Sequence, residues 1–387
     1  MHHPLQVLKH YWGYDGFRPG QAEVIDSILS GHDTLALMPT GGGKSITFQV
    51  PALANPGICL VISPLVALMK DQVKNLQKRG ILSAFISSEM PHWEILQQLD
   101  NCILGDYKFL YISPERISSE LFQEKLKTLS SKVNLLVVDE AHCISQWGND
   151  FRRDYRLIAD IRDAIPHVQV IAVTASATAA VVADICEQLH FRKGYRIFKT
   201  SFERKNLSFV VRKTDNKLKE ICHILSAVPG SAVIYSRTRK GVEEYAGKLR
   251  AAGISAEYFH AGLDPVLKTE RQADWVKGFT RVLVATNAFG MGIDKGDVRV
   301  VIHTEFPDSM EAYYQEAGRA GRDGKRAYAV ALLGPQDITD IKRRPSNAFP
   351  TIEYIKRVYE ALCNRFQIAE GDGEGVSVYL DEPEFFR

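Results

Sequence analysis

Short apolar runs alternate with amphipathic segments along most of this chain. The runs that are expected to form strands cover residues 34–38, 58–63, 84–87, 109–112, 135–138 and 168–173. Between them, segments such as 65–78 and 181–189 repeat their apolar residues at the spacing of a helix. The strands of a parallel sheet that is covered on both faces have this continuous apolar character, and helices connect them. The pattern therefore predicts an α/β fold built on a mainly parallel sheet.

The same alternation restarts in the second half of the chain. Further strands are expected at 232–235, 282–285, 298–302 and 328–333, and helices at 217–228, 239–252, 310–320 and 351–368. We therefore expect a first domain over residues 1–202, a second over 203–344, and a short helical extension over 345–387. A length of 387 residues also favours two domains over a single core.

Composition and charge are those of a soluble globular protein, with 45% hydrophobic and 24% charged residues and a net charge of +2. The charge is net positive in 203–344 and net negative after it, which permits a nucleic-acid ligand without requiring one. No apolar run approaches the roughly 20 residues of a membrane span, and no secretory signal is visible, so no membrane partner is expected. The six cysteines are scattered, so we expect them to be reduced and expect no structural zinc.

A glycine-rich segment lies between the first apolar run and a helical one. Residues 39–45 read Pro-Thr-Gly-Gly-Gly-Lys-Ser, the pattern of a phosphate-binding loop except that Met38 stands where a glycine is usual. In such a loop, backbone N–H groups bind the phosphates, Lys44 reaches the β- and γ-phosphates, and Ser45 ligates Mg²⁺. The expected nucleotide contacts are Thr40, Gly41, Gly42, Gly43, Lys44 and Ser45.

Two acids follow another expected strand. Asp139 and Glu140 come directly after the run 135–138, and open α/β sheets bind ligands at the carboxyl ends of their strands. We assign Asp139 to Mg²⁺ and make Glu140 the general base for the attacking water. A solvated acidic turn is the alternative for the pair alone, but the acids and the glycine-rich loop together indicate a nucleotide hydrolase.

Further segments carry a family resemblance. Residues 14–21 contain Tyr14, Arg18 and Gln21, and residues 315–324 read Gln-Glu-Ala-Gly-Arg-Ala-Gly-Arg-Asp-Gly. With the loop and the acid pair, these segments resemble the RecQ family of DNA helicases, over residues from about 11 to 345. The resemblance implies two tandem RecA-like domains that bind ATP.

The resemblance also implies roles for residues around the nucleotide. Its further contacts with ATP would be Tyr14 and Arg18 on the base, Gln21 at the edge of adenine, and Asp294. In the second domain it makes Gln315, Arg319 and Arg322 catalytic, with Arg322 as the arginine finger and Arg319 assisting it. These two arginines are three positions apart, so a helix over 310–320 that continued through them would place both on one face.

The DNA contacts that the resemblance implies lie in several segments. They are Ser63, Lys70, Trp147, Phe151, Arg152, Arg153 and Asn287. Residues 143–155 resemble the aromatic-rich loop of the family, in which aromatic rings stack on bases and arginines follow phosphates. Asn149 stands where the family commonly has histidine, so we expect a different coupling between DNA binding and hydrolysis.

The implied function is that of an ATP-dependent DNA helicase. It would use ATP and Mg²⁺ to move 3′-to-5′ on single-stranded and tailed duplex DNA, in recombination and repair. It would act at the nucleoid in the cytoplasm of a bacterium, or otherwise in a nucleus. An RNA-directed helicase, a nucleic-acid-stimulated ATPase without strand separation and a non-catalytic clamp switched by ATP remain alternatives.

The end of the chain departs from the family pattern. After residue 345 only Cys363 is present, so we expect neither the family's four-cysteine zinc subdomain nor its winged helix in this chain. Strand separation by this chain alone stays open, and we expect the natural protein to continue past Arg387.

Overall fold

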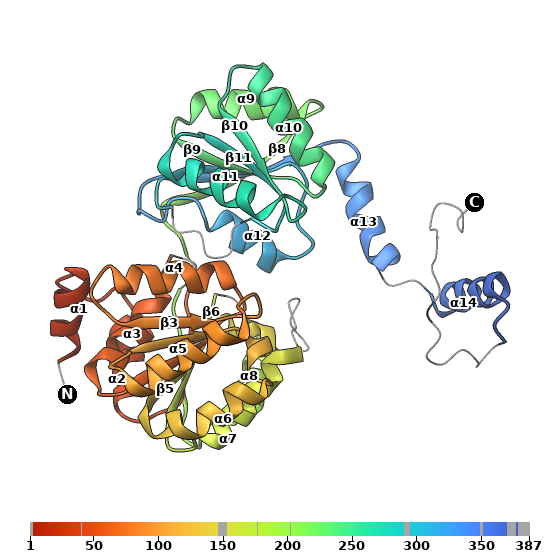
Figure 1. The fold of residues 1–387 in the computed structure, drawn as a ribbon. Helices are drawn as coiled ribbons and strands as arrows, with labels where there is room; N and C mark the ends of the chain where they lie inside the picture. Colours follow the sequence, from red (N-terminus) through yellow and green to blue (C-terminus); the bar gives the residue numbers. More distant parts are fainter. Residues whose placement is uncertain are drawn as a thin grey trace. The chain divides into compact units, whose positions relative to one another are not determined.

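A computed structural model describes residues 3–39, 41–145, 153–175, 177–201, 203–289, 295–348, 351–369 and 377. The chain divides into two compact units (Figure 1), one made of residues 1–212 and 217–332 and the other of 213–216 and 333–387. The first unit holds both sheets, and we call the parts built on them the first and second domains. The boundaries expected at residues 202 and 344 stay predictions.

The first domain is built on a seven-stranded sheet in the order β3-β4-β2-β5-β6-β1-β7, and its strand pairs are parallel. The strands are β1 (Thr34–Leu37), β2 (Ile58–Ile62), β3 (Ser83–Ile86), β4 (Phe109–Ile112), β5 (Val133–Val138), β6 (Gln169–Thr174) and β7 (Arg196–Lys199). The helices are α1 (Pro4–Trp12), α2 (Gln21–Leu29), α3 (Lys44–Ala54), α4 (Val66–Gln77), α5 (His92–Leu104), α6 (Glu120–Leu129), α7 (Ile158–Ala164) and α8 (Ala179–Gln188). Short 3₁₀ turns lie at Pro114–Arg116, Ser130–Lys132, Ala141–Ile144 and Arg153–Leu157.

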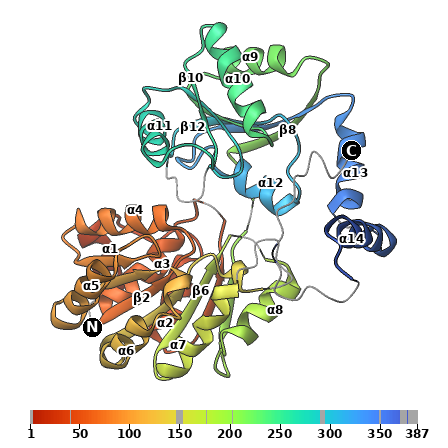
Figure 2. The same cartoon turned by 45° about the vertical axis from the view of Figure 1, so that its right-hand side comes forward.

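Alternate residues of the central strands enter two separate cores. Leu35 and Leu60 pack with apolar residues of α5 to α8, whereas their neighbours Ala36 and Val61 pack with those of α1 to α4. Because side chains alternate along a strand, the two cores lie on opposite faces of the sheet. The expectation of a parallel sheet covered by helices on both faces is therefore confirmed (Figure 2).

The second domain is built on a six-stranded sheet in the order β10-β11-β9-β12-β13-β8. Its strands are β8 (Leu207–Lys213), β9 (Ser231–Tyr235), β10 (Ala256–Phe259), β11 (Val282–Ala285), β12 (Val298–His303) and β13 (Ala327–Leu333). Helices α9 (Lys217–Ala227) and α10 (Arg239–Ala251) pack in one core, and α11 (Pro265–Lys277) and α12 (Met310–Ala317) in another. The second unit contains α13 (Asp337–Ala348) and α14 (Ile352–Phe366).

Three strands were not expected from the sequence, and their burial explains why. Strands β7 and β8 lie at edges of their sheets, where most of their residues are exposed or half-buried. Strand β10 is also at an edge, and only its first and last residues are buried. An edge strand lacks one neighbour and part of its cover, so the apolar signal in the sequences of β7, β8 and β10 is weaker than in the central strands.

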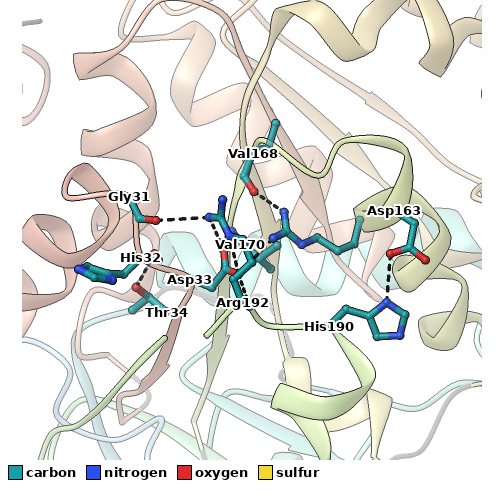
Figure 3. Close-up of polar contacts among 10 residues, drawn as sticks. Gly31, His32, Asp33, Thr34, Asp163, Val168, Val170, His190 and Arg192 are labelled. Carbon is teal, nitrogen blue, oxygen red and sulfur yellow. Dashed lines mark hydrogen bonds and ion pairs between the residues drawn. The ribbon is translucent and has the colours of Figure 1, made fainter. Parts of the chain in front are cut away.

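A buried carboxylate holds the first domain together at the amino end of β1. Asp33 accepts hydrogen bonds from the backbone N–H groups of Val170 and Arg192, at 2.9 and 2.8 Å. It also pairs with the guanidinium group of Arg162 at 3.2 Å. Figure 3 shows its pairing with Arg192, at 2.9 Å. A charge buried this deeply is tolerated only when it is paired and hydrogen-bonded, so this cluster fixes β1, β6 and the segment before β7 to one another. Among the described residues, no helix is long and apolar enough to cross a membrane.

Candidate active site

The glycine-rich loop joins β1 to α3, as its position in the sequence predicted. Gly41 and Gly43 adopt φ values of +78° and +76°, which residues with a Cβ rarely adopt. A Cβ on Gly43 would lie 2.5 Å from Nε2 of Gln21, so the amide of Gln21 would have to shift. Lys44 begins α3, and the backbone N–H groups at the start of a helix favour an anion. Thr40 lies outside the described residues.

Gln21 and Arg18, which were expected to contact adenine, donate hydrogen bonds to carbonyl groups of this loop. Gln21 is 3% exposed, and its Nε2 donates to the carbonyl oxygens of Gly43 (3.0 Å) and Gly42 (3.3 Å). Its Oε1 accepts from the backbone N–H of Arg18, whose Nη1 donates to the carbonyl of Gly41 (2.8 Å). The amide therefore supports the loop in this structure, and its contact with adenine stays a prediction.

Asp139 and Glu140 follow β5 and face the loop. Nζ of Lys44 lies 3.4 Å from Oε1 of Glu140, and the Ser63 hydroxyl donates to Oδ2 of Asp139 at 3.4 Å. Burial and, after it, the charge of Glu140 raise the pKa of Asp139 to about 6, while Lys44 and the Ser63 hydrogen bond oppose the rise. Desolvation and the neighbouring carboxylate thus both disfavour the ionised form of Asp139.

Two adjacent, half-buried carboxyl groups fit a cation with oxygen ligands. Within the described residues, no group of three or more His, Cys, Asp or Glu side chains is arranged to hold a metal. Mg²⁺ does not need one, because it binds through one or two carboxylates, waters and the phosphates of the nucleotide. The Asp139 carboxylate and the Ser45 hydroxyl are oxygen donors of the required kind, and both line one cavity.

A histidine links the acid pair to a neighbouring strand. Nδ1 of His142 lies 2.9 Å from the Thr174 hydroxyl and 3.4 Å from Oε2 of Glu140. Thr174 ends β6, so the histidine connects the acid pair to the next strand of the sheet. Tyr155 also contacts this turn, because its hydroxyl donates to the carbonyl of Asp139 at 2.9 Å.

The arginines of residues 315–324 do not lie on a helix, so that expectation was wrong. Helix α12 ends at Ala317, and Arg319 and Arg322 occupy the turn that follows. Gly318 caps the helix and Gly321 has φ +65°, a left-handed conformation that a helix cannot contain. The two arginines are therefore brought together by a turn, and not by helical spacing.

One cavity nevertheless gathers the expected nucleotide residues of both domains. Its lining includes Tyr14, Arg18, Gln21, Gly41, Gly43, Lys44, Ser45, Asp139, Glu140, Gln315, Arg319 and Arg322. A Cβ on Gly41 would lie 3.3 Å from Cγ of Arg322, so that side chain lies against the loop. Asp294 lies outside the described residues, and Gly42 does not line this cavity.

The cavity also includes residues that the sequence did not single out. Gln49 and Gln72 line it and are joined by a hydrogen bond of 3.1 Å, and Trp12 and Arg79 line it too. Gln49 lies five positions after Lys44 on α3, yet no motif or spacing distinguishes it from other helical glutamines. Polar residues of this kind become recognisable only when the fold puts them beside the site.

The residues expected to contact DNA have mixed environments. Lys70 is exposed and pairs with Glu89 at 3.2 Å, and Asn287 is exposed just after β11. Ser63 is 1% exposed, and its hydroxyl is directed to Asp139 rather than to solvent. Trp147, Phe151, Arg152 and the side chain of Arg153 lie outside the described residues.

Comparisons with known proteins agree with this geometry. The sequence profile of the family described as DEAD/DEAH box helicase matches residues 18–185, and that of the helicase conserved C-terminal domain matches 216–324. The chain is 43% identical over 341 residues to the ATP-dependent DNA helicase RecQ of Bacillus subtilis, covering 87% of this chain and 57% of that protein. It is also 39% identical to the probable ATP-dependent DNA helicase RecS of the same organism, over 86% of this chain and 67% of that one.

The solved structure of Mycobacterium smegmatis helicase Lhr bound to ssDNA and AMP-PNP shares the fold, with a TM-score of 0.69 and 20% identity. The alignment covers 88% of this chain and 49% of that one. The two RecA-like domains expected from the sequence are therefore confirmed as an architecture. The chain spans little more than half the length of the Bacillus RecQ protein.

Proposed function

Because the chain belongs to the RecQ family of DNA helicases, we propose that it hydrolyses ATP to move 3′-to-5′ along single-stranded DNA and to unwind duplexes. One observation carries the proposal: the cavity gathers a phosphate-loop lysine, an acid pair and two arginines that come from both domains. These are the groups that phosphoryl transfer to water requires.

Each group has a definite task in that reaction. The loop N–H groups and Lys44 bind the phosphates of ATP, while Ser45 and Asp139 would hold Mg²⁺, which neutralises charge on the phosphates when it is bound. Glu140 accepts the proton of the attacking water. Arg319 and Arg322 stabilise the negative charge that develops on the γ-phosphoryl oxygens, a contribution worth roughly 10³–10⁵ in rate for an arginine finger.

The substrate proposal rests on where the remaining residues lie. Single-stranded DNA would bind at Lys70 and Asn287 and at the aromatic and basic residues of 143–155, which follow the acid pair directly in sequence. Because only a few residues separate this segment from Asp139 and Glu140, a bound DNA strand could change the position of these two acids. Tailed duplexes would be the substrates for unwinding, in recombination and repair, at the bacterial nucleoid or in a nucleus.

The test measures ATP turnover and strand displacement in parallel. We expect single-stranded DNA to stimulate turnover more than single-stranded RNA, and Glu140→Gln to lower turnover by about 10³-fold or more while nucleotide binding persists. A duplex with a 3′ tail should be displaced faster than the same duplex with a 5′ tail. Preferential stimulation by RNA would support the RNA-directed alternative, and the absence of turnover with every polynucleotide would refute the proposal.

A further inference from the structure

We propose that Arg204 and Asn206, in the segment that joins the two domains, are positioning residues that hold Arg319 and Arg322 in place for ATP hydrolysis. This inference rests on the proposed function and adds to it two residues that contact neither nucleotide nor DNA in the scheme above. Its basis is a set of hydrogen bonds that all end on the turn carrying the two arginines.

Arg204 supplies the first part of this set. Its Nη1 donates to the carbonyl of Gly318 at 3.2 Å, and its Nη2 donates to those of Ala320 and Gly321 at 2.9 and 3.0 Å. The last carbonyls of a helix have no partner within the helix, so the turn after α12 needs donors from elsewhere. A planar guanidinium is well suited to bind several of them, and its N–H groups are fixed in direction.

Asn206 supplies the second part, two residues further on. Its side-chain Nδ2 donates to the backbone carbonyls of Gly321 (2.7 Å) and Lys325 (2.8 Å). The backbone carbonyl of Asn206 accepts from the N–H of Ala327 (2.9 Å). The N–H of Gly321 in turn donates to Val298 of β12 at 2.9 Å. The turn is therefore fixed on one side by the linker and on the other by the sheet.

Gly321 lies at the centre of this arrangement, between the two arginines in sequence. With φ +65°, a Cβ there would lie 2.5 Å from Nδ2 of Asn206 and 2.9 Å from the Lys325 carbonyl oxygen. The linker side chains thus approach the turn as closely as a glycine allows. Arg204 is half-buried at these contacts, and this burial lowers the pKa of its guanidinium.

The other end of the linker is attached to the strand that leads into the phosphate loop. The backbone N–H and the hydroxyl of Thr200 both donate to the carbonyl of Leu37, at 3.0 and 3.2 Å. Leu37 ends β1, immediately before the loop. Arg204 lies four positions after Thr200, and an extended chain of four such steps reaches about 14 Å at most. A short tether therefore connects the strand before Lys44 to the turn that carries Arg319 and Arg322.

The effect on the reaction follows from geometry. An arginine finger must reach the transferring phosphoryl group within a few tenths of an ångström, and a misplacement of about 1 Å can cost about 100-fold in rate. The Arg204 and Asn206 hydrogen bonds restrict the backbone conformations of the turn before ATP binds. Loss of these contacts should therefore lower kcat and leave ground-state binding of ATP nearly unchanged.

The experiment compares four forms of the full chain: wild type, Arg204→Lys, Asn206→Ala and Lys205→Ala. Arg204→Lys keeps the charge but cannot reach three carbonyls at once, and the exposed Lys205 is the matched control in the same segment. DNA-stimulated turnover, affinity for AMP-PNP, affinity for ADP with aluminium fluoride and thermal unfolding are measured for each. We expect kcat to fall about 10- to 100-fold in the first two variants and less than twofold in the control.

The two affinities separate positioning from a general loss of structure. The aluminium fluoride complex mimics the transition state, so its affinity should fall by a factor similar to that for kcat, while the AMP-PNP affinity changes less than twofold. Equal losses in both affinities, or wild-type turnover in Arg204→Lys and Asn206→Ala, would overturn the inference. A wild-type protein without nucleic-acid-stimulated turnover would instead overturn the proposed function.

Discussion

Replacing Asp139 by asparagine should stabilise the nucleotide-free protein while removing its activity. The carboxylate lies beside Glu140 in a half-buried position, where its pKa is raised to about 6 from an ordinary value of 3.8. Above pH 6 this carboxyl group is therefore ionised in the folded protein, although its negative charge is less favourable there than in the unfolded chain. An amide of the same shape removes that charge and keeps a hydrogen-bonding group in place.

The size and sign of the effect follow from proton linkage. Because the folded pKa is the higher one, the folded state binds more protons between pH 4 and 6, and its stability falls as the pH rises through that window. The difference of about two pKa units corresponds to about 3 kcal/mol at pH 8 and to roughly half of that at pH 5. For domains of this size, about 3 kcal/mol raises Tm by roughly 5–10 °C.

Differential scanning calorimetry at pH 5 and pH 8, without nucleotide or divalent cations, measures this directly. We expect Asp139→Asn to exceed the wild type in Tm at pH 8, with a smaller gain at pH 5, and to lose Mg²⁺-dependent turnover at both. Asp106→Asn is the control, because Asp106 is exposed before β4 and its charge is hydrated in both states. A gain that is the same at both pH values, or a lower Tm than the wild type at pH 8, would refute the electrostatic reasoning.

Three further substitutions test other parts of the structure. Asp33→Asn should lower the unfolding free energy of the first domain by about 3–5 kcal/mol in calorimetry, because the buried guanidinium of Arg162 and the half-buried one of Arg192 lose their charged partner; a loss below about 1 kcal/mol would contradict this. Gly43→Ala should weaken AMP-PNP binding about 10-fold or more, whereas Gly80→Ala, with the same positive φ but nothing near its Cβ position, should leave it unchanged. Gly321→Ala should lower kcat about 10-fold or more. Gly324→Ala is the control, because φ is also positive there and the space around its Cβ position is open. Equal losses of kcat in the two variants would count against a role for the close contacts at Gly321.

The central strands of both sheets could be predicted because burial on two faces leaves a continuous apolar run in the sequence. Strands β2, β4 and β11 lie within two residues of their expected bounds. The edge strands β7 and β8 could not be predicted in this way, because Arg196 and Lys199 leave β7 only two apolar residues, and exposed and half-buried positions alternate along most of β8. The end of α12 was misjudged because a helical pattern does not reveal that Gly321 has a positive φ.

The candidate site shows the same division between local and long-range information. Lys44, Ser45 and the acid pair are recognisable because the chemistry of each depends on a few consecutive residues after a strand. Gln21 was noticed, but the fold directs its amide to the loop carbonyls and not outward. Arg204 was not noticed at all, because its three partners lie more than 110 positions away, and nothing in the surrounding sequence records them.

The short connection between Thr200 and Arg204 has a consequence for how proteins of this kind can change during evolution. Surface connections usually accept added residues, because lengthening a loop costs little free energy. Here an insertion would leave both sheets able to fold but would loosen the link between the strand before the phosphate loop and the turn with the two arginines. We therefore expect this spacer to be conserved in length more strictly than in residue type, and a library of insertions along the chain should be depleted at this point even among folded variants.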